Sequence, residues 1–428
     1  MTILIICNAF TPEAAKALGV RGSTRMGWVE GLLTGIEKTS MDSLNLYICT
    51  PYYKVSETIR ANKENITYLA IPKPEENIKG FLEIMTDQFK ILLKEVNPDI
   101  VHIFGTEYFH TLAMVNASMS IPTIISIQGL VSIYAKHYLT SLPNSLFRFD
   151  AFRKLTNITK RNSISYGKEQ FDKCGDYEIK ALEKARYVEG RTTWDYACVK
   201  QVNRNIKYYF LDRTLRDTFY NKSWEISNCV KHSIFITQAS YPIKGLHILL
   251  EAIPIILDKF PTAHVYIAGG IQKFGKGIKQ KIKNAVFQYN GYICKLVNKF
   301  KLNDKITYLG DLSEQQMYEQ FLKSHVYVLP SLIENESNSL CEAMILGVPC
   351  VASYVGGLPD SLEHNKEGFL FQCDAPYMLA HYVCEIFGCD ELALRFSFEA
   401  KKRASIRHNQ ENNYNELISI YKDIIMEL

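Results

Sequence analysis

Two glutamates eight positions apart are the residues of this chain best placed to do chemistry. The stretch 333–344, IENESNSLCEAM, contains Glu334 and Glu342. Between 338 and 347 the only carboxylate is Glu342, and its neighbours are leucine, alanine, methionine and isoleucine. A segment that is apolar nearly all round is typical of a buried helix, and a carboxylate there is costly unless something pairs with it. The pattern therefore predicts that Glu342 has a specific partner.

Two interpretations of Glu342 follow from the residues alone. Ser339-Leu-Cys-Glu342 fits the Ser-x-x-Glu capping box, in which Glu342 would only close a helix end. Alternatively, a predicted strand at 325–330 ends just before this stretch, and the helix after it offers backbone N–H groups to an anion. A diphosphate would then lie near Asn338, Ser339 and Leu340. The two carboxylates would accept hydrogen bonds from sugar and ribose hydroxyls, which predicts a nucleotide-sugar site.

The elements that must position these residues form two series of strands alternating with helices. The expected strands are 2–8, 44–50, 66–71, 99–105, 123–129, 187–192 and 208–211, then 233–237, 264–269, 305–310, 325–330, 350–354 and 368–371. Runs that are apolar on both faces and separated by helices predict parallel sheets covered on both sides. A capping box at Ser313–Gln316 predicts a helix towards Lys323, and 412–428 predicts a final helix. Ligands of such sheets bind at the carboxyl ends of the strands.

The expected organisation is two doubly wound Rossmann-like domains facing a cleft. Residues 1–226, completed by about 410–428, form the predicted acceptor domain, and residues 227–409 form the predicted nucleotide-sugar domain. Residues 227–233 are the expected link between them. At 428 residues the chain is too long for one ordinary core.

Composition narrows the class of protein. A formal charge of +4 is too small to indicate a nucleic-acid partner. The 11 cysteines are scattered without a CxxC motif, and no secretory leader is recognisable. This predicts reduced thiols in a cytoplasmic protein. No apolar run approaches the roughly 18 residues that a membrane span needs.

A basic, aromatic segment at 147–173 breaks the strand–helix pattern. It contains seven lysines and arginines interleaved with five aromatic residues and three acids. Two interpretations stay open: a peripheral contact with an anionic membrane surface on the cytoplasmic face, or a solvated loop and helix.

The stretch 331–353, SLIENESNSLCEAMILGVPCVAS, resembles the E-x7-E signature of family 4 glycosyltransferases, which are retaining enzymes of the GT-B fold. The resemblance implies that Glu334 contacts hydroxyls of the transferred sugar and that Glu342 contacts the ribose. YPIKGLHILLEA resembles the opening of the family's second domain, where Lys244 would meet the donor diphosphate. YVGGLPDSL, with Gly356 and Gly357, resembles the turn after the signature, and the final helix resembles one that crosses back to the first domain.

The resemblance extends to the other expected contacts. GSTRMGWVEGL is similar to the family's glycine-rich loop, in which Gly22 and Gly27 would let the backbone approach donor or acceptor. Base recognition is expected from backbone groups near 309–312, which include Gly310. The alternative for these glycines is that they only turn the chain.

Two positions depart from the family pattern. Many relatives carry an arginine five residues before the lysine, where this chain has Ala239, flanked by Gln238 and Ser240. The diphosphate must then rely on Lys244, the helix dipole, Ser240 and Arg191. Many relatives place a histidine where this chain has Gln128, which holds a hydroxyl but takes no proton. His110, beside Glu107 in GTEYFHTL, is the alternative catalytic candidate, although a lone histidine before a helix is often structural.

These observations predict a retaining, nucleotide-sugar-dependent glycosyltransferase that acts on a hydroxyl of a glycan or lipid-linked glycan in cell-surface polysaccharide synthesis. No Asp-x-Asp occurs and no His/Cys cluster has zinc-like spacing, so neither a metal nor another cofactor is expected. A nucleotide-sugar epimerase of the same fold and a catalytically silent nucleotide-sugar-binding module are the two alternatives.

Overall fold

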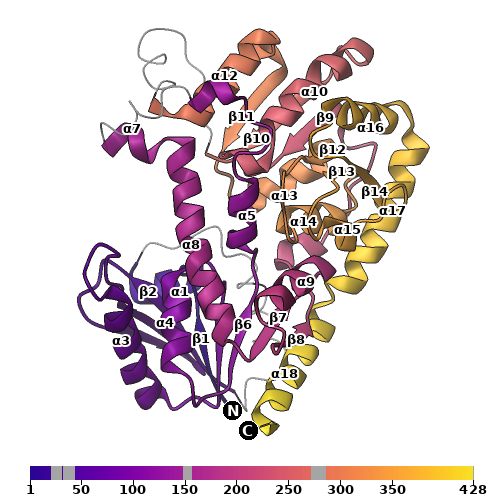
Figure 1. The fold of residues 1–428 in the computed structure, drawn as a ribbon. Helices are drawn as coiled ribbons and strands as arrows, with labels where there is room; N and C mark the ends of the chain where they lie inside the picture. The colour runs from indigo at the N-terminus through magenta and orange to yellow at the C-terminus, as the bar shows by residue number, and fades with distance from the viewer. Residues whose placement is uncertain (21–30, 32–43, 148–156, 271–285, 428) are drawn as a thin grey trace. The chain divides into compact units, whose positions relative to one another are not determined.

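The computed structural model describes residues 1–20, 31, 44–147, 157–270 and 286–427. Within these residues the chain divides into two compact units (Figure 1). Unit 1 comprises Met1–Ser132, Lys173–Arg216 and Arg407–Leu428, and unit 2 comprises Ile133–Asp172 and Asp217–Ile406. No described helix is both long enough and apolar enough to span a lipid bilayer.

Unit 1 is built on an eight-stranded sheet in the order β3-β4-β2-β1-β5-β6-β7-β8. Its strands are β1 Thr2–Ile6, β2 Asn45–Tyr52, β3 Ile59–Lys63, β4 Ile66–Pro72, β5 Ile100–Phe104, β6 Thr123–Ser126, β7 Tyr187–Gly190 and β8 Lys207–Phe210. The strands are parallel except for β3, which pairs antiparallel with β4 at the sheet edge. The chain runs outward from β1 to one edge and then returns through β5, so the strand order reverses between β1 and β5.

The helices of unit 1 include one from the far end of the chain. They are α1 Pro12–Leu18, α3 Phe81–Val96, α4 Phe109–Ala117, α9 Thr193–Val202 and α18 Gln410–Met426, with the first residues of α5 Val131–His137 and most of α8 Ile164–Lys184. Leu417, Ile420 and Ile424 of α18 are buried in the same core cluster as Ile3 and Ile5 of β1. The predicted final helix that crosses back to the first domain is confirmed.

Unit 2 contains a six-stranded parallel sheet in the order β11-β10-β9-β12-β13-β14. Its strands are β9 Val230–Ile236, β10 His264–Ala268, β11 Ile306–Gly310, β12 Ser324–Leu329, β13 Cys350–Ser353 and β14 Gly368–Phe371. The helices are α7 Asn157–Arg161, α10 Leu246–Lys259, α12 Gln288–Lys299, α13 Glu314–Lys323, α14 Asn338–Leu346, α15 Leu358–Ser361, α16 Pro376–Gly388 and α17 Asp390–Arg407. Here the strand order reverses between β9 and β12, and in such sheets ligands bind at the carboxyl ends of the strands beside the reversal.

All the strands that the sequence predicts are present, with ends that differ by at most three residues. Two predictions need correction. Strand β3 was not expected, because its residues IRANK lack the apolar run that marks a buried strand. The predicted link at 227–233 is wrong in its second half, since Val230 already opens β9. The predicted domain limits, 1–226 with 410–428 and 227–409, stay a prediction.

Candidate functional site

The strand reversal of unit 2 brings Lys244 and Glu334 together. Lys244 ends the short 3-10 helix η4, Pro242–Lys244, which follows β9, while Glu334 lies in the loop after β12. The Lys244 Nζ lies 2.6 Å from Glu334 Oε2, and the two side chains are 10% and 9% exposed. Burial favours the neutral lysine, but the adjacent Glu334 carboxylate outweighs it and raises the pKa of Lys244 above its ordinary value. Lys244 is therefore a buried cation.

A tyrosine that the sequence did not single out holds the Glu334 loop. The Tyr134 hydroxyl donates to Glu334 Oε1 at 3.4 Å and accepts from the Asn335 backbone N–H at 2.7 Å. Ser331 Oγ donates to Glu334 Oε2 at 3.3 Å. Tyr134 belongs to α5, 200 residues away in the chain, so no local pattern could have indicated it. These contacts fix both carboxylate oxygens.

Two glycines keep this loop in place by having no side chain. Gly245 has φ +70°, and a Cβ there would lie 1.7 Å from the Pro330 carbonyl oxygen. Gly356 has φ +52°, and its Cβ would lie 1.9 Å from the Glu334 carbonyl oxygen. The neighbouring Gly357 N–H donates to that same oxygen at 3.1 Å. The Gly-Gly turn therefore does more than redirect the chain, because it supports the backbone of Glu334.

Helix α14 begins immediately after this loop. Its N-cap is Ser337, whose hydroxyl accepts from the Leu340 N–H. Asn338 and Ser339 are thus the first two helical residues, and Leu340 follows them with its N–H already engaged by the cap. The N-terminus of a nine-residue helix offers partial positive charge to a phosphate.

The structure tests one of the two interpretations of Glu342, the capping box. The side chain is buried in the second turn of α14 and is 6% exposed. A capping box would need Ser339 as N-cap and Glu342 as the third helical residue. The N-cap is Ser337 instead, so the capping-box interpretation is wrong.

Ala239 and Ser240 follow β9, and Gly310 ends β11, which is separated from β9 by β10 in the same sheet. Ser240 is exposed after β9, whereas Ala239 is fully buried. Position 239, where many relatives carry an arginine, therefore holds a small side chain packed in the core. Gly310 ends β11 with φ +73°, and no atom lies within 4 Å of the place a Cβ would occupy.

The strand reversal of unit 1 carries a second polar cluster, formed by Asn8, Glu107 and His110. Asn8 follows β1, and its Nδ2 donates to Glu107 Oε1 at 2.7 Å. His110 Nε2 lies 2.8 Å from Asn8 Oδ1. An amide oxygen only accepts, so Nε2 carries the proton. Gly105, with φ +96°, makes room for the cluster, because its Cβ would lie 2.4 Å from Asn8 Nδ2.

Burial shifts the protonation of this cluster towards neutral forms. It raises the pKa of Glu107 to about 7, with Glu178 adding repulsion, while backbone N–H groups and Asn8 oppose the rise. It also lowers the pKa of His110 well below its ordinary value, and Lys73 adds to the effect. Within the described residues, His110 Nδ1 is buried and has no hydrogen-bond partner. As a base, His110 would have to act through that buried nitrogen.

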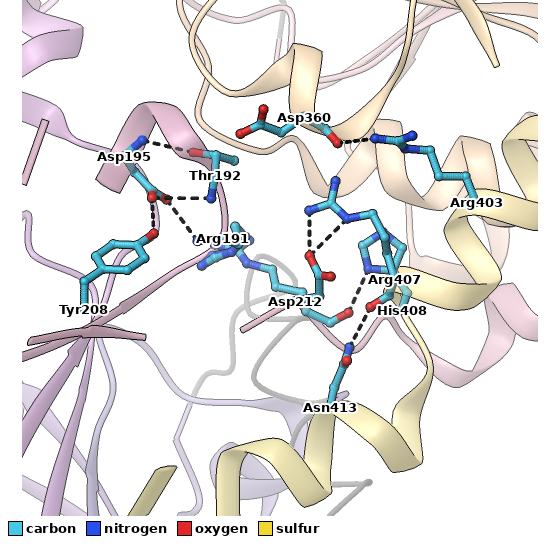
Figure 2. A network of polar contacts seen from close by, with 11 residues as sticks. Arg191, Thr192, Asp195, Tyr208, Asp212, Asp360, Arg403, Arg407, His408 and Asn413 are labelled. Atoms are coloured by element: carbon cyan, nitrogen blue, oxygen red, sulfur yellow. Dashed lines mark hydrogen bonds and ion pairs between the residues drawn. The ribbon is translucent and has the colours of Figure 1, made fainter. Parts of the chain in front are cut away.

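Gln128 and Arg191 are held by other parts of unit 1. Gln128 Oε1 accepts from Arg213 Nη2 at 2.8 Å. The Arg191 guanidinium donates to the Ile127 carbonyl oxygen, at 2.9 Å from Nη1. The Arg191 backbone N–H donates to Asp195 Oδ2 at 3.2 Å (Figure 2). Both side chains therefore support the carboxyl end of β6. The remaining predicted residues, Gly22 and Gly27, lie outside the described residues.

Residues 221–403 match the family described as "Glycosyl transferases group 1". A D-inositol 3-phosphate glycosyltransferase of Corynebacterium urealyticum is 22% identical over 184 residues, which cover 42% of this chain and 41% of the relative. The chain spans less than half the length of the first curated relatives that it matches.

Solved structures show the same fold over the whole chain. A sucrose-phosphate synthase from Thermosynechococcus elongatus has a TM-score of 0.74 at 14% identity, with 100% of both chains covered. The Anabaena protein HepE, solved with UDP-glucose, has a TM-score of 0.67 at 12% identity and covers 99% of this chain and 100% of its own. Residues 221–403 therefore resemble the group 1 glycosyl transferases, and the chain has the GT-B fold.

Proposed function

We propose that the protein is a retaining glycosyltransferase that moves a sugar from a nucleotide-sugar donor to a hydroxyl of a glycan acceptor. The observation that carries this proposal is the buried pair of Lys244 and Glu334 at the strand reversal of unit 2, directly before the N-terminus of α14. The group 1 family match supports the transfer reaction. HepE, of the same fold, binds UDP-glucose, which supports a nucleotide sugar as donor.

Each group at this strand reversal suits one part of a donor. Lys244 and the first N–H groups of α14, at Asn338 and Ser339, suit the diphosphate, whose charge grows as the sugar leaves. Glu334 suits the hydroxyls of the transferred sugar, and Glu342 suits the ribose hydroxyls. Ser240, after β9, and Gly310, at the end of β11, lie at carboxyl ends of strands of the same sheet, where they suit the remainder of the nucleotide.

The reaction breaks the bond between the anomeric carbon and the phosphate oxygen and forms one to the acceptor oxygen, with release of a proton. In unit 1, the Glu107 carboxyl has a raised pKa and oxygens that suit a hydrogen bond with the acceptor hydroxyl. Asn8 holds this carboxyl, and His110 holds Asn8. Gln128 and Arg191 support the neighbouring loop. Because Lys244 and the helix terminus neutralise the diphosphate, we expect full activity in the presence of a metal chelator.

The acceptor class is part of the proposal. The basic, aromatic segment 147–173 suits a lipid-linked glycan at the cytoplasmic face of a membrane, as in cell-surface polysaccharide synthesis. Peripheral attachment predicts binding to anionic vesicles that weakens as salt is raised. Equal binding to neutral vesicles would contradict it.

The first test is thermal stabilisation by UDP, GDP, ADP, CMP and dTDP without metal. A ligand that binds only the native state adds about 2.7 kcal/mol at a hundredfold excess over its Kd. We expect one nucleotide to raise the melting temperature of wild type. It should also raise that of Glu385→Gln, an exposed control in unit 2, and should raise that of Glu342→Gln much less.

Product analysis with the matching nucleotide sugar then separates the reactions. Transfer to an added acceptor with the donor's anomeric configuration is the expected result. An acceptor-independent product would instead indicate an epimerase, and nucleotide binding without any turnover would indicate a silent binding module.

A further inference from the structure

A cavity in unit 2 lies beside the strand reversal. Its volume is about 220 Å³, and it opens at the carboxyl ends of β9 and β10, where Ser240 and Gly270 line it. The remaining walls come from the residue after α5, from the start of α8 and from the N-terminus of α12. Sites for drug-sized ligands measure roughly 300–1,000 Å³. The cavity therefore fits one small ring rather than a whole nucleotide sugar.

The walls of this cavity are held by hydrogen bonds, so its shape does not depend on a ligand. Gln288 Oε1 accepts from the Ile164 N–H at 2.8 Å, and Gln288 Nε2 donates to the Leu146 carbonyl oxygen at 2.6 Å. Tyr138 lies so close to Gly167 that a Cβ there would meet its hydroxyl oxygen at 2.2 Å. The cavity is preformed, which lowers the ordering cost of binding.

The chemistry of the lining is aromatic and amide-like. Tyr138, Tyr241 and Tyr289 present rings to the cavity, and no carboxylate occurs among its described lining residues. Asn290 also lines it, and among the described residues both the Oδ1 and the Nδ2 of Asn290 are buried without a hydrogen-bond partner. A buried amide with neither donor nor acceptor satisfied is costly. A ligand that both donates and accepts removes that cost.

We infer that this cavity binds a pyranose unit of the acceptor glycan, with preference for an acidic sugar; the inference rests on the proposed glycosyltransferase function. Sugar rings offer C–H faces to aromatic rings and hydroxyls that both donate and accept, which matches the three tyrosines and Asn290. Arg161, on the rim, supplies the positive charge for a carboxylate or phosphate substituent.

The position of Tyr241 links the cavity to the proposed donor site. Tyr241 lines the cavity, and the Lys244 Nζ lies 5.9 Å from the centroid of its ring. A sugar bound in the cavity would therefore be a near neighbour of the leaving diphosphate.

Saturation-transfer NMR on the full chain tests the inference directly. The probes are methyl β-glucopyranoside, the corresponding methyl glucuronoside and uridine. We expect both glycosides to bind wild type, the glucuronoside more tightly, and Asn290→Leu to weaken both by about tenfold. Arg161→Gln should remove the preference for the acidic sugar. Asn298→Leu, an exposed asparagine of the same helix, is the matched control and should bind like wild type.

The outcomes separate this inference from the proposed function. Binding of uridine alone, or glycoside binding that Asn290→Leu leaves unchanged, would overturn the saccharide site. Stabilisation by a nucleoside diphosphate, measured on the same samples, reports the donor site independently. If that stabilisation persists while no glycoside binds, only the saccharide site is wrong; if glycosides bind without any nucleotide, the proposed transferase function is wrong.

Discussion

Lys244 and Glu334 neutralise each other in the absence of a donor. Their contact of 2.6 Å, in a place where both side chains are about nine-tenths buried, keeps two charges out of water. An incoming diphosphate offers Lys244 a second anion, and sugar hydroxyls offer Glu334 new donors. The pair therefore keeps a positive and a negative group at the place where the proposed donor would bind. Removal of either partner alone would lower stability, because the other charge would stay buried without a counter-ion.

Replacing Lys244 should affect both stability and donor binding. In Lys244→Gln the buried Glu334 carboxylate loses its cation, and breaking such a pair costs about 3–5 kcal/mol. The loss of one charged hydrogen bond should weaken nucleotide binding by about 10–150-fold. Urea unfolding and calorimetric titration measure the two effects.

Lys259→Gln is the matched control, because that lysine is exposed in the same unit. It should leave both quantities unchanged. Unaltered nucleotide affinity in a folded Lys244→Gln protein would remove this lysine from the donor site.

Glu107 should make stability depend on pH. Its pKa rises from 4.5 to about 7 in the folded protein. Between these values the native state keeps a proton that the unfolded state has released, so stability is lost as pH rises through the window, by up to about 1.4 kcal/mol per pH unit. Among the described residues, the titratable groups that bear on this carboxyl or on its His110 neighbour are Glu178, Cys174 and Lys73.

The comparison of wild type with Glu107→Gln isolates this contribution. Urea unfolding at pH 5, 6, 7 and 8 should show that the stability of wild type relative to the variant decreases over the range. Glu83→Gln, an exposed change on α3, should differ from wild type in stability by an amount that stays constant over this pH range. A constant difference between wild type and Glu107→Gln would mean that Glu107 titrates normally.

At the scale of elements, the loop after β12 is held between two other segments of unit 2. One is the turn with Gly356, and Gly356→Ala should displace the Glu334 backbone because the new Cβ would lie 1.9 Å from its carbonyl oxygen. We expect a lower melting temperature and weaker nucleotide binding. Gly19→Ala has a similar φ of +67° but nothing within 4 Å, so it measures the backbone strain alone. Equal losses in both variants would show that the contact with Glu334 is unimportant.

Helix α5 is the other element that holds this loop, through Tyr134. In Tyr134→Phe, Glu334 loses a hydrogen-bond donor and the Asn335 N–H loses its acceptor. Such a loss is worth about 1–3 kcal/mol. We expect a roughly tenfold lower transfer rate with nucleotide affinity within about twofold, because the sugar contact and not the diphosphate contact is misplaced. Tyr377→Phe, an exposed change, should have neither effect.

At the scale of the whole molecule, two compact units predict two unfolding transitions. Leu417 of α18 is fully buried in the core of unit 1, so Leu417→Ala should cost about 2–5 kcal/mol and lower one transition. A nucleotide that binds unit 2 should raise the other. Calorimetric scans of wild type, Leu417→Ala and the exposed control Glu416→Ala measure this. A single transition that Leu417→Ala lowers and the nucleotide raises would contradict independent units.

The sequence by itself determined the strands, the parallel sheets and the identity of Glu334, Glu342 and Lys244 as candidates. Buried parallel strands carry continuous apolar runs, and a lone carboxylate within such a run is visible without coordinates. Helix starts were legible where the cap is local, as at Ser313, whose box with Gln316 is present. The same local rule left the start of α14 open, because Ser337 and Ser339 both fit an N-cap.

Only the tertiary structure decided which residues meet. Asn8 reaches Glu107 across 99 positions, because the parallel neighbours β1 and β5 bring their carboxyl ends to one edge. Tyr134 reaches Glu334 across 200 positions from helix α5, a contact that no strand pairing predicts. The contact of Gly356 with the Glu334 carbonyl oxygen likewise depends on the packing of separate loops. A sequence specifies which side chains are polar and where chains turn, but long-range pairing through a folded sheet sets which of those polar groups share a site.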